Sequence, residues 1–188
     1  MQFSKSAKIT QVSNLITLVV VGVAWGYNWP QELALSYGLH KFLHITGVVL
    51  FFGNLIVGPL WVLFAWFLEG GRHLRFATQV LSNADICFTV PGIQLTLWNG
   101  IYLAASMGGI KSHGWLVEAM VLLIVTSLFS AFLVLPWQER LVASTMGTDF
   151  ALMKRYLVRW SIWGTAVLVP ITLVAWLMVV KQPLILGP

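Results

Sequence analysis

One apolar run, residues 40–66 (HKFLHITGVVLFFGNLIVGPLWVLFAW), constrains the fold of this chain more than any other feature. Apart from its histidines, Lys41 is its only charged side chain, and a helix needs only about 20 apolar residues to cross the hydrocarbon core of a bilayer. The whole chain is similar, with 59% hydrophobic and 9% charged residues and a mean hydropathy of +0.85. This composition predicts one integral membrane domain over residues 1–188.

Five apolar segments of this kind follow one another, and turn-forming or polar residues separate them. We expect the membrane spans at about 9–27, 40–68, 86–107, 115–137 and 160–181. The first segment lacks a clear small-residue cleavage site, so we interpret it as a retained span and not a signal peptide. The polar, basic residues 138–158 are expected to lie partly helical along the membrane surface. The predicted fold is all-α, a polytopic bundle of five transmembrane helices made of a four-helix core and an N-terminal span.

The basic residues predict the orientation of these spans. Eight of the eleven Lys and Arg residues lie on the side of the N-terminus and three on the opposite side. Basic loops remain in the cytoplasm, so the N-terminus is expected inside and the C-terminus outside. Residues 69–84 and 138–158 are then cytoplasmic, and residues 108–114 are extracytoplasmic.

The second predicted span carries its polar residues on one helical face. Steps of four and three residues join His40, His44, Gly47, Phe51, Asn54 and Gly58. The third span has a similar stripe of Asp85, Thr89, Gly92, Thr96 and Asn99. Polar groups are costly in hydrocarbon, so both stripes should turn away from lipid. We predict that they face each other across a cavity that could hold a cofactor.

The histidines are the main candidate ligands. His44 lies one turn inside the span, whereas His40 could also sit among lipid headgroups and His113 could be a solvated loop residue. Gly47 could admit a flat cofactor or only allow close helix packing. The candidate cofactor-binding residues are His44, His40, His113, Gly47, Phe51, Asn54 and Asn99. The candidate metal ligands are His44, His40, His113 and Glu118, and Glu118 could instead pair with Lys111.

Spacing limits the cofactors that these histidines could share. Imidazoles four residues apart can reach one metal ion from the same side, but they cannot both be axial ligands of one haem. Copper would therefore use His40 and His44 together, whereas haem b would use one of them. No nucleophile–base pair, paired carboxylates or phosphate loop appears in the spans, so catalytic residues stay unknown. The chain also lacks the soluble basic patch of a nucleic-acid-binding protein.

Three stretches resemble a bacterial family of predicted integral membrane proteins, the domain of unknown function 2269. They are residues 43–58 (LHITGVVLFFGNLIVG), 88–100 (FTVPGIQLTLWNG) and 159–183 (RWSIWGTAVLVPITLVAWLMVVKQP). The first stretch is also distantly similar to the copper-resistance D membrane domain and to the haem-binding J-type protoporphyrinogen oxidases. The resemblance implies a four-helix core in the bacterial inner membrane. From the haem-binding relatives it carries over one ligand, His44.

These observations lead to three functional hypotheses. The first is a haem b protein of the inner membrane, acting in electron transfer or as a small redox subunit, with its site near the extracytoplasmic face. It would need a redox partner in the membrane or outside it. The second is a copper-binding or copper-transporting protein that uses His40, His44 and His113. The third is a cofactor-free structural subunit of a larger membrane complex, with lipid as its other partner.

Overall fold

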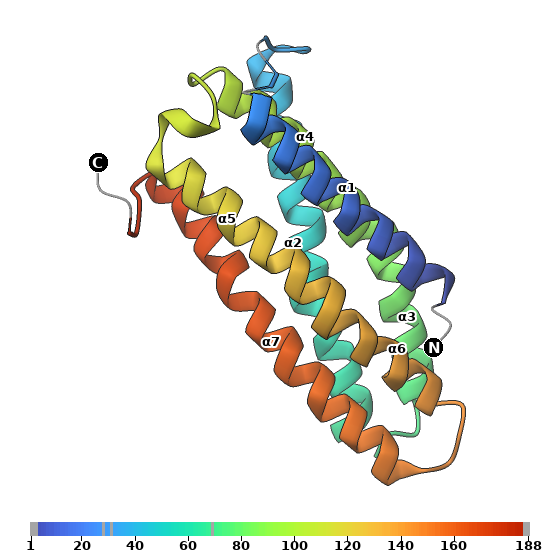
Figure 1. The fold of residues 1–188 in the computed structure, drawn as a ribbon. Coiled ribbons are helices and arrows are strands. Elements are labelled where there is room, and N and C mark those ends of the chain that lie inside the picture. Colours follow the sequence, from blue (N-terminus) through green and yellow to red (C-terminus); the bar gives the residue numbers. More distant parts are fainter. Residues whose placement is uncertain (1–3, 28, 31, 69, 186–188) are drawn as a thin grey trace.

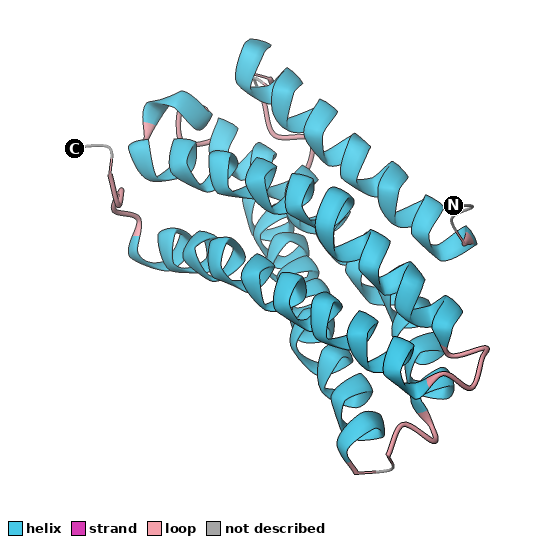
Figure 2. Cartoon of the chain, turned by 60° about the horizontal axis from the view of Figure 1, so that its bottom comes forward, coloured by secondary structure: helices cyan, strands magenta, loops and turns pink. Residues whose placement is uncertain are grey.

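A computed structural model describes residues 4–27, 29–30, 32–68 and 70–185. In this part of the chain every regular element is a helix (Figure 2). The elements are α1 (Lys5–Tyr27), α2 (Tyr37–Phe67), α3 (Leu74–Ala84), η1 (Asp85–Thr89), α4 (Val90–Ala105), η2 (Ile110–Ser112), α5 (Gly114–Phe129), η3 (Ser130–Val134), α6 (Leu135–Ser144) and α7 (Phe150–Val180). The all-α fold class is thereby confirmed.

Several of these elements join into longer helices. The π-helical segment η1 connects α3 to α4, and the π-helical segment η3 connects α5 to α6. Since the residues that link them keep right-handed helical angles, each set forms one continuous helix. Five long helical rods result, and consecutive rods run in opposite directions (Figure 1). We call the end where α2 begins the His40 end and the end where α3 begins the Arg72 end.

The packing order of the rods differs from their order in the chain. α2 lies along α4, which is its principal partner, and α5 and α6 lie along α7. α1 packs against α4 and α5, and in Figure 1 it lies beside α5 on the side away from α7. The start of α1 and the end of α7 lie at opposite ends of the bundle, as an odd number of rods requires.

Four helices in the described residues are long and apolar enough to cross a membrane. They are Lys5–Tyr27, Tyr37–Phe67, Gly114–Ser144 and Phe150–Val180. These match four of the predicted spans, but the helix that contains the predicted span 86–107 is not among them. Its apolar part carries Gln94 and Asn99, which lower its hydropathy. The segment 138–158 also differs from expectation, because its first residues continue α6 to Ser144 and its last residues begin α7.

The ends of the helices are set by local hydrogen bonds and glycine. Ser36 caps α2 by accepting a hydrogen bond from the Leu39 amide, and Asp149 caps α7 through the Leu152 amide. Gly108 and Gly109 follow α4 with φ of 94° and 96°, a conformation that side chains disfavour. The predicted break after residue 68 includes Glu69, which lies outside the described residues.

Two apolar clusters form the core. The first lies toward the His40 end and includes Val21, Ile101, Ala119 and Leu177. The second lies toward the Arg72 end and contains Val62, Leu74, Leu141, Leu157 and Trp160 among others. Along the rod from Leu74 to Ala105, residues of the second cluster come first, then Asp85 and Thr89, then residues of the first cluster. Asp85 and Thr89 therefore lie between two apolar layers.

Candidate functional site

The two polar stripes face each other, because α2 and α4 pack along their length. His40 reaches Asn99, His44 reaches Thr96, and Asn54 reaches Thr89 and Asp85. The predicted pairing of the stripes is therefore confirmed. At Gly47 and Gly92 the facing helices are in direct contact, which leaves no room there for the cavity expected between the stripes.

His40 is held at both ring nitrogens. Its side chain is 2% exposed, and the Leu35 amide donates a hydrogen bond of 3.1 Å to Nε2. Because Nε2 accepts, Nδ1 carries the proton and donates to Asn99 Oδ1 at 2.8 Å. The ring also stacks on Tyr102, with centroids 4.6 Å apart. His40 therefore joins the start of α2 to α4 and leaves no ring nitrogen free for a metal.

His44 is held at one ring nitrogen only. Nδ1 lies 2.8 Å from the carbonyl oxygen of Thr96, and since a carbonyl can only accept, Nδ1 carries the proton. The other nitrogen, Nε2, then has a lone pair, and no described residue donates to it. The ring lies against Gly100, where an added Cβ would come within 2.9 Å of Nδ1. His44 is partly exposed and is thus an oriented imidazole with one available nitrogen.

The glycines of the stripes bring the two helices into backbone contact. A Cβ at Gly47 would lie 2.6 Å from the Thr96 amide nitrogen and 2.7 Å from the Gly92 carbonyl oxygen. A Cβ at Gly92 would lie 2.7 Å from the Phe51 amide nitrogen. Gly47 and Phe51 therefore pack on α4. For Gly47 this agrees with the alternative in which the glycine allows close helix packing. The space there does not admit a porphyrin.

The predicted residue Asn54 belongs to a polar cluster that sequence reasoning did not assemble. Asn54 Nδ2 donates to Asp85 Oδ1 at 3.0 Å and to Thr89 Oγ1 at 2.8 Å. Gln138, on α6, donates to Asp85 Oδ2 at 2.8 Å. Asp85 lay in the predicted stripe, but Gln138 is 53 residues away in the sequence and no periodicity relates the two.

The two remaining candidates lie at the His40 end in different settings. His113 is exposed, its Nε2 lies 3.2 Å from the Met107 carbonyl oxygen, and its ring stacks on Trp115. Glu118 is 8% exposed, and its carboxylate accepts hydrogen bonds from the amides of Leu184 and Ile185. Glu118 thus holds the segment that follows α7.

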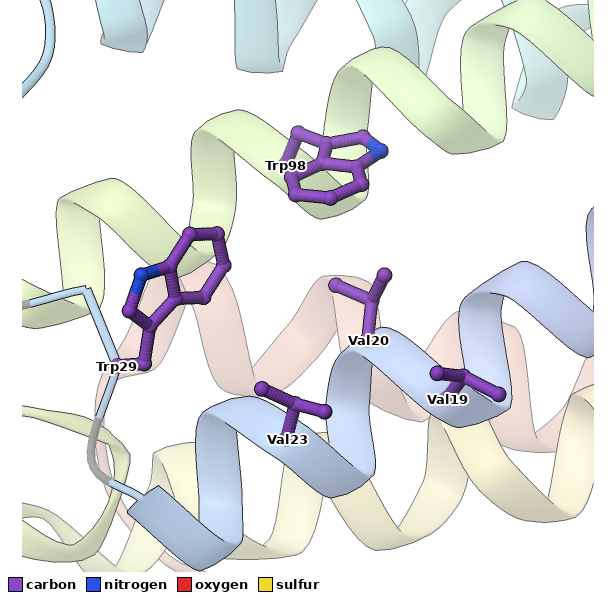
Figure 3. A pocket seen from close by; sticks show the side chains of 5 residues that line it. All are labelled: Val19, Val20, Val23, Trp29 and Trp98. Carbon is purple, nitrogen blue, oxygen red and sulfur yellow. The ribbon is translucent and has the colours of Figure 1, made fainter.

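The predicted metal ligands do not converge. Within the described residues, no three side chains of His, Cys, Asp or Glu come together to hold a metal ion. Two hollows in the described residues are open and mostly apolar. One of ≈ 220 Å³ lies between α1 and α4, where Trp29 and Trp98 meet Val19, Val20 and Val23 (Figure 3). None of the predicted ligands lines it.

The fold and the paired stripes define a polytopic helical membrane protein. The model of a family described as predicted integral membrane protein (DUF2269) matches residues 38–182, so the chain belongs to this family. The match covers α2 through α7 and leaves α1 outside, in agreement with the expectation that the first helix is additional to the family core. No curated protein and no solved structure matches the chain.

Proposed function

We propose that the protein is a haem b-binding redox subunit of the bacterial inner membrane, in which His44 would hold the haem. The observation that carries this proposal is the state of the His44 imidazole. Its Nδ1–H donates to the Thr96 carbonyl, so Nε2 is unprotonated and its ring is fixed in direction. Histidines that bind metals commonly donate their second nitrogen to a carbonyl or carboxylate in this way.

The fit to haem is limited to this one residue. Gly47, Phe51 and Asn54 contact the rod that contains α4, and Asn99 on that rod is hydrogen-bonded to His40, which has both nitrogens occupied. We therefore assign only His44 to the proposed haem. A bound haem would supply one-electron chemistry, while the protein provides the imidazole and its orientation.

The same geometry disfavours the copper hypothesis. Copper bound by both helix histidines would need a free nitrogen on His40, which donates at Nδ1 and accepts at Nε2. His113 uses one ring nitrogen at the Met107 carbonyl, and it lies in the connection before α5, outside the α2–α4 contact. No three such ligands come together in the described residues, which favours an iron porphyrin, with four ligands of its own, over an ion that needs several protein ligands.

The proposal includes a topology and a partner. The rod from Leu74 to Ala105 runs antiparallel to α2 and contacts it through α3, η1 and α4, which supports a fifth span in addition to the four apolar helices. With the N-terminus in the cytoplasm, His44 lies in the outer half of the membrane. Since the described residues contain no soluble domain, electrons would come from a partner in the membrane or outside it, or within a larger complex.

An absorption spectrum tests the haem proposal. The protein purified in detergent is expected to show a reduced haem band after dithionite addition, and His44→Ala should remove it. His113→Ala is the matched control, because this histidine is exposed and lies outside the α2–α4 contact, and it should retain the band. Wild-type protein without haem, or His44→Ala with full haem content, would overturn the proposal.

A cofactor-free structural subunit is the second candidate. The direct contact of the two stripes supports it, since most of their polar side chains already satisfy one another. Under this hypothesis the protein purified from its native membrane contains neither haem nor copper, and it co-purifies with other membrane subunits. Metal analysis of that preparation distinguishes the two candidates.

A further inference from the structure

The cluster around Asp85 is a second candidate site, separate from His44. Its four side chains come from three rods: Asn54 from α2, Asp85 and Thr89 from η1, and Gln138 from α6. Gln138 is 7% exposed. Residues of the second apolar cluster, among them Leu81 and Val62, follow toward the Arg72 end. The cluster is therefore a polar layer inside the bundle.

The charge of this cluster is uncompensated. Asp85 accepts hydrogen bonds from Asn54, Thr89 and Gln138, and all three are neutral. No Lys, Arg or His in the described residues pairs with its carboxylate. Asp85, Asn54 and Thr89 are half-buried between the rods. A lone carboxylate at this depth in a membrane protein is costly unless a positive charge neutralises it. One monovalent cation would neutralise it, whereas a divalent cation would leave a charge of the opposite sign.

The partners of Asp85 also carry the atoms that a cation needs. Rotating the side-chain amide of Asn54 or Gln138 by half a turn replaces its NH₂ with its oxygen at nearly the same position. The Thr89 hydroxyl can likewise present a lone pair. Together with the carboxylate, the cluster can offer oxygen ligands from four side chains, and hard cations prefer oxygen.

The backbone at Asp85 is irregular within an otherwise continuous helix. The Val90 amide donates to the Asp85 carbonyl, which is the wider hydrogen-bond ring of a π-helix. Such segments occur frequently at functional sites. The π-segment widens the helix where Asp85 and Thr89 face Asn54.

We propose that Asp85, Asn54, Thr89 and Gln138 form a binding site for a sodium ion inside the bundle. Sodium carries the single charge that the carboxylate requires, and the four neutral or anionic side chains supply its oxygen ligands.

Thermal unfolding of the purified full-length protein tests this site. Sodium chloride replaces choline chloride at constant ionic strength and pH, and potassium chloride serves as the comparison. Sodium should raise the melting temperature and approach saturation, with a smaller effect of potassium. An ion present at 100 times its Kd lowers the ratio of unfolded to folded protein by about 100-fold.

Three variants locate the effect. Asp85→Asn should abolish the sodium response, and Thr89→Val, which keeps the carboxylate and the side-chain shape, should weaken the apparent sodium affinity at least ~10-fold, the factor for the loss of one ligand contact of ordinary strength. Glu139→Gln is the matched control, because this neighbouring carboxylate is hydrogen-bonded to Ser4 and not to the cluster. It should keep the full response.

The wild-type measurement is sufficient to overturn the proposal if Asp85→Asn fails to fold. A wild-type protein whose melting temperature is equal in sodium, potassium and choline has no sodium site. Stability that changes with pH but not with sodium would assign the cluster to a proton instead. A sodium response retained in Asp85→Asn would place the ion elsewhere.

Discussion

Two histidines one helical turn apart have different roles because their ring nitrogens have different partners. His40 donates through Nδ1 and accepts through Nε2, so it links the loop before α2 to α4. His44 donates through Nδ1 alone. At the ring nitrogens, the Leu35 amide at His40 distinguishes the two. His40 therefore has a structural role, and the ligand role that we propose is assigned to His44.

The structural role of His40 predicts a loss of stability on truncation. His40→Ala leaves Asn99 Oδ1 buried without its donor and removes the ring that stacks on Tyr102. We expect the free energy of unfolding to fall by about 1–3 kcal/mol, the usual cost of an unsatisfied buried polar group. Denaturant unfolding in detergent measures it. Lys41→Ala, at the exposed neighbouring position, should change stability by far less, and equal effects would contradict the assignment.

At the scale of elements, glycine determines how closely α2 approaches α4. Gly47 and Gly92 face each other's helices at distances where a Cβ would meet backbone atoms. Gly53, on the same helix, has nothing within 4 Å of the position of a Cβ. The close contact therefore depends on which face of α2 a glycine occupies and not on how many glycines the helix contains. This is expected for small residues at helix interfaces in membranes.

The pair Gly47→Ala and Gly53→Ala tests this contact. At Gly47 the methyl group would lie 2.6 Å from the Thr96 amide nitrogen, so the helices must separate, at a cost of about 1–3 kcal/mol for overpacking. At Gly53 the methyl group has space, and higher helix propensity should leave stability equal or raise it by up to ~1 kcal/mol. Thermal unfolding of the two cofactor-free proteins compares them. If Gly47→Ala leaves the melting temperature unchanged, the contact between α2 and α4 is looser than described.

At the scale of the whole molecule, the rods alternate in direction, so every second connection lies at the same end. Most of the basic residues lie in or near the connections at the Arg72 end. Arg72, Arg140 and Lys154 belong to or adjoin the connections at the Arg72 end, whereas Lys111 and Lys181 lie at the His40 end. Positive charge is retained in the cytoplasm, which favours the Arg72 end as the inner end. In the orientation that we propose, His44 would lie in the outer half of the membrane and Asp85 closer to the inner side.

Cysteine labelling in intact cells tests this orientation. After the exposed Cys87 is replaced by Ser, a membrane-impermeant reagent should modify Ser112→Cys, in the connection after α4, and not Ser144→Cys, at the end of α6. Permeabilised cells should allow modification of both, which controls for local accessibility. Labelling of Ser144→Cys alone in intact cells would invert the topology and move His44 to the cytoplasmic half.

Much of the architecture is encoded locally. Long apolar runs form helices because the bilayer leaves no other partner for backbone hydrogen bonds, and polar side chains every three to four residues mark the face that must turn inward. For this reason residues 40–66 and the stripe from Asp85 to Asn99 predicted both the helices and their pairing. The hydropathy of the third span was less decisive, because Gln94 and Asn99 on that helix face other helices and not lipid.

The chemistry of the stripes was decided only by the tertiary structure. Whether Gly47 borders a cavity or a helix depends on how far α4 approaches, and spacing along α2 carries no information about that distance. The Leu35 amide donates to Nε2 of His40, so this nitrogen cannot bind a metal. Leu35 lies in the loop before α2, and helical periodicity does not predict such a contact. Gln138 completes the Asp85 cluster across 53 residues. The sequence determined by itself which side chains turn inward, because that depends on local periodicity and hydrophobicity, whereas their partners depend on how separate helices pack.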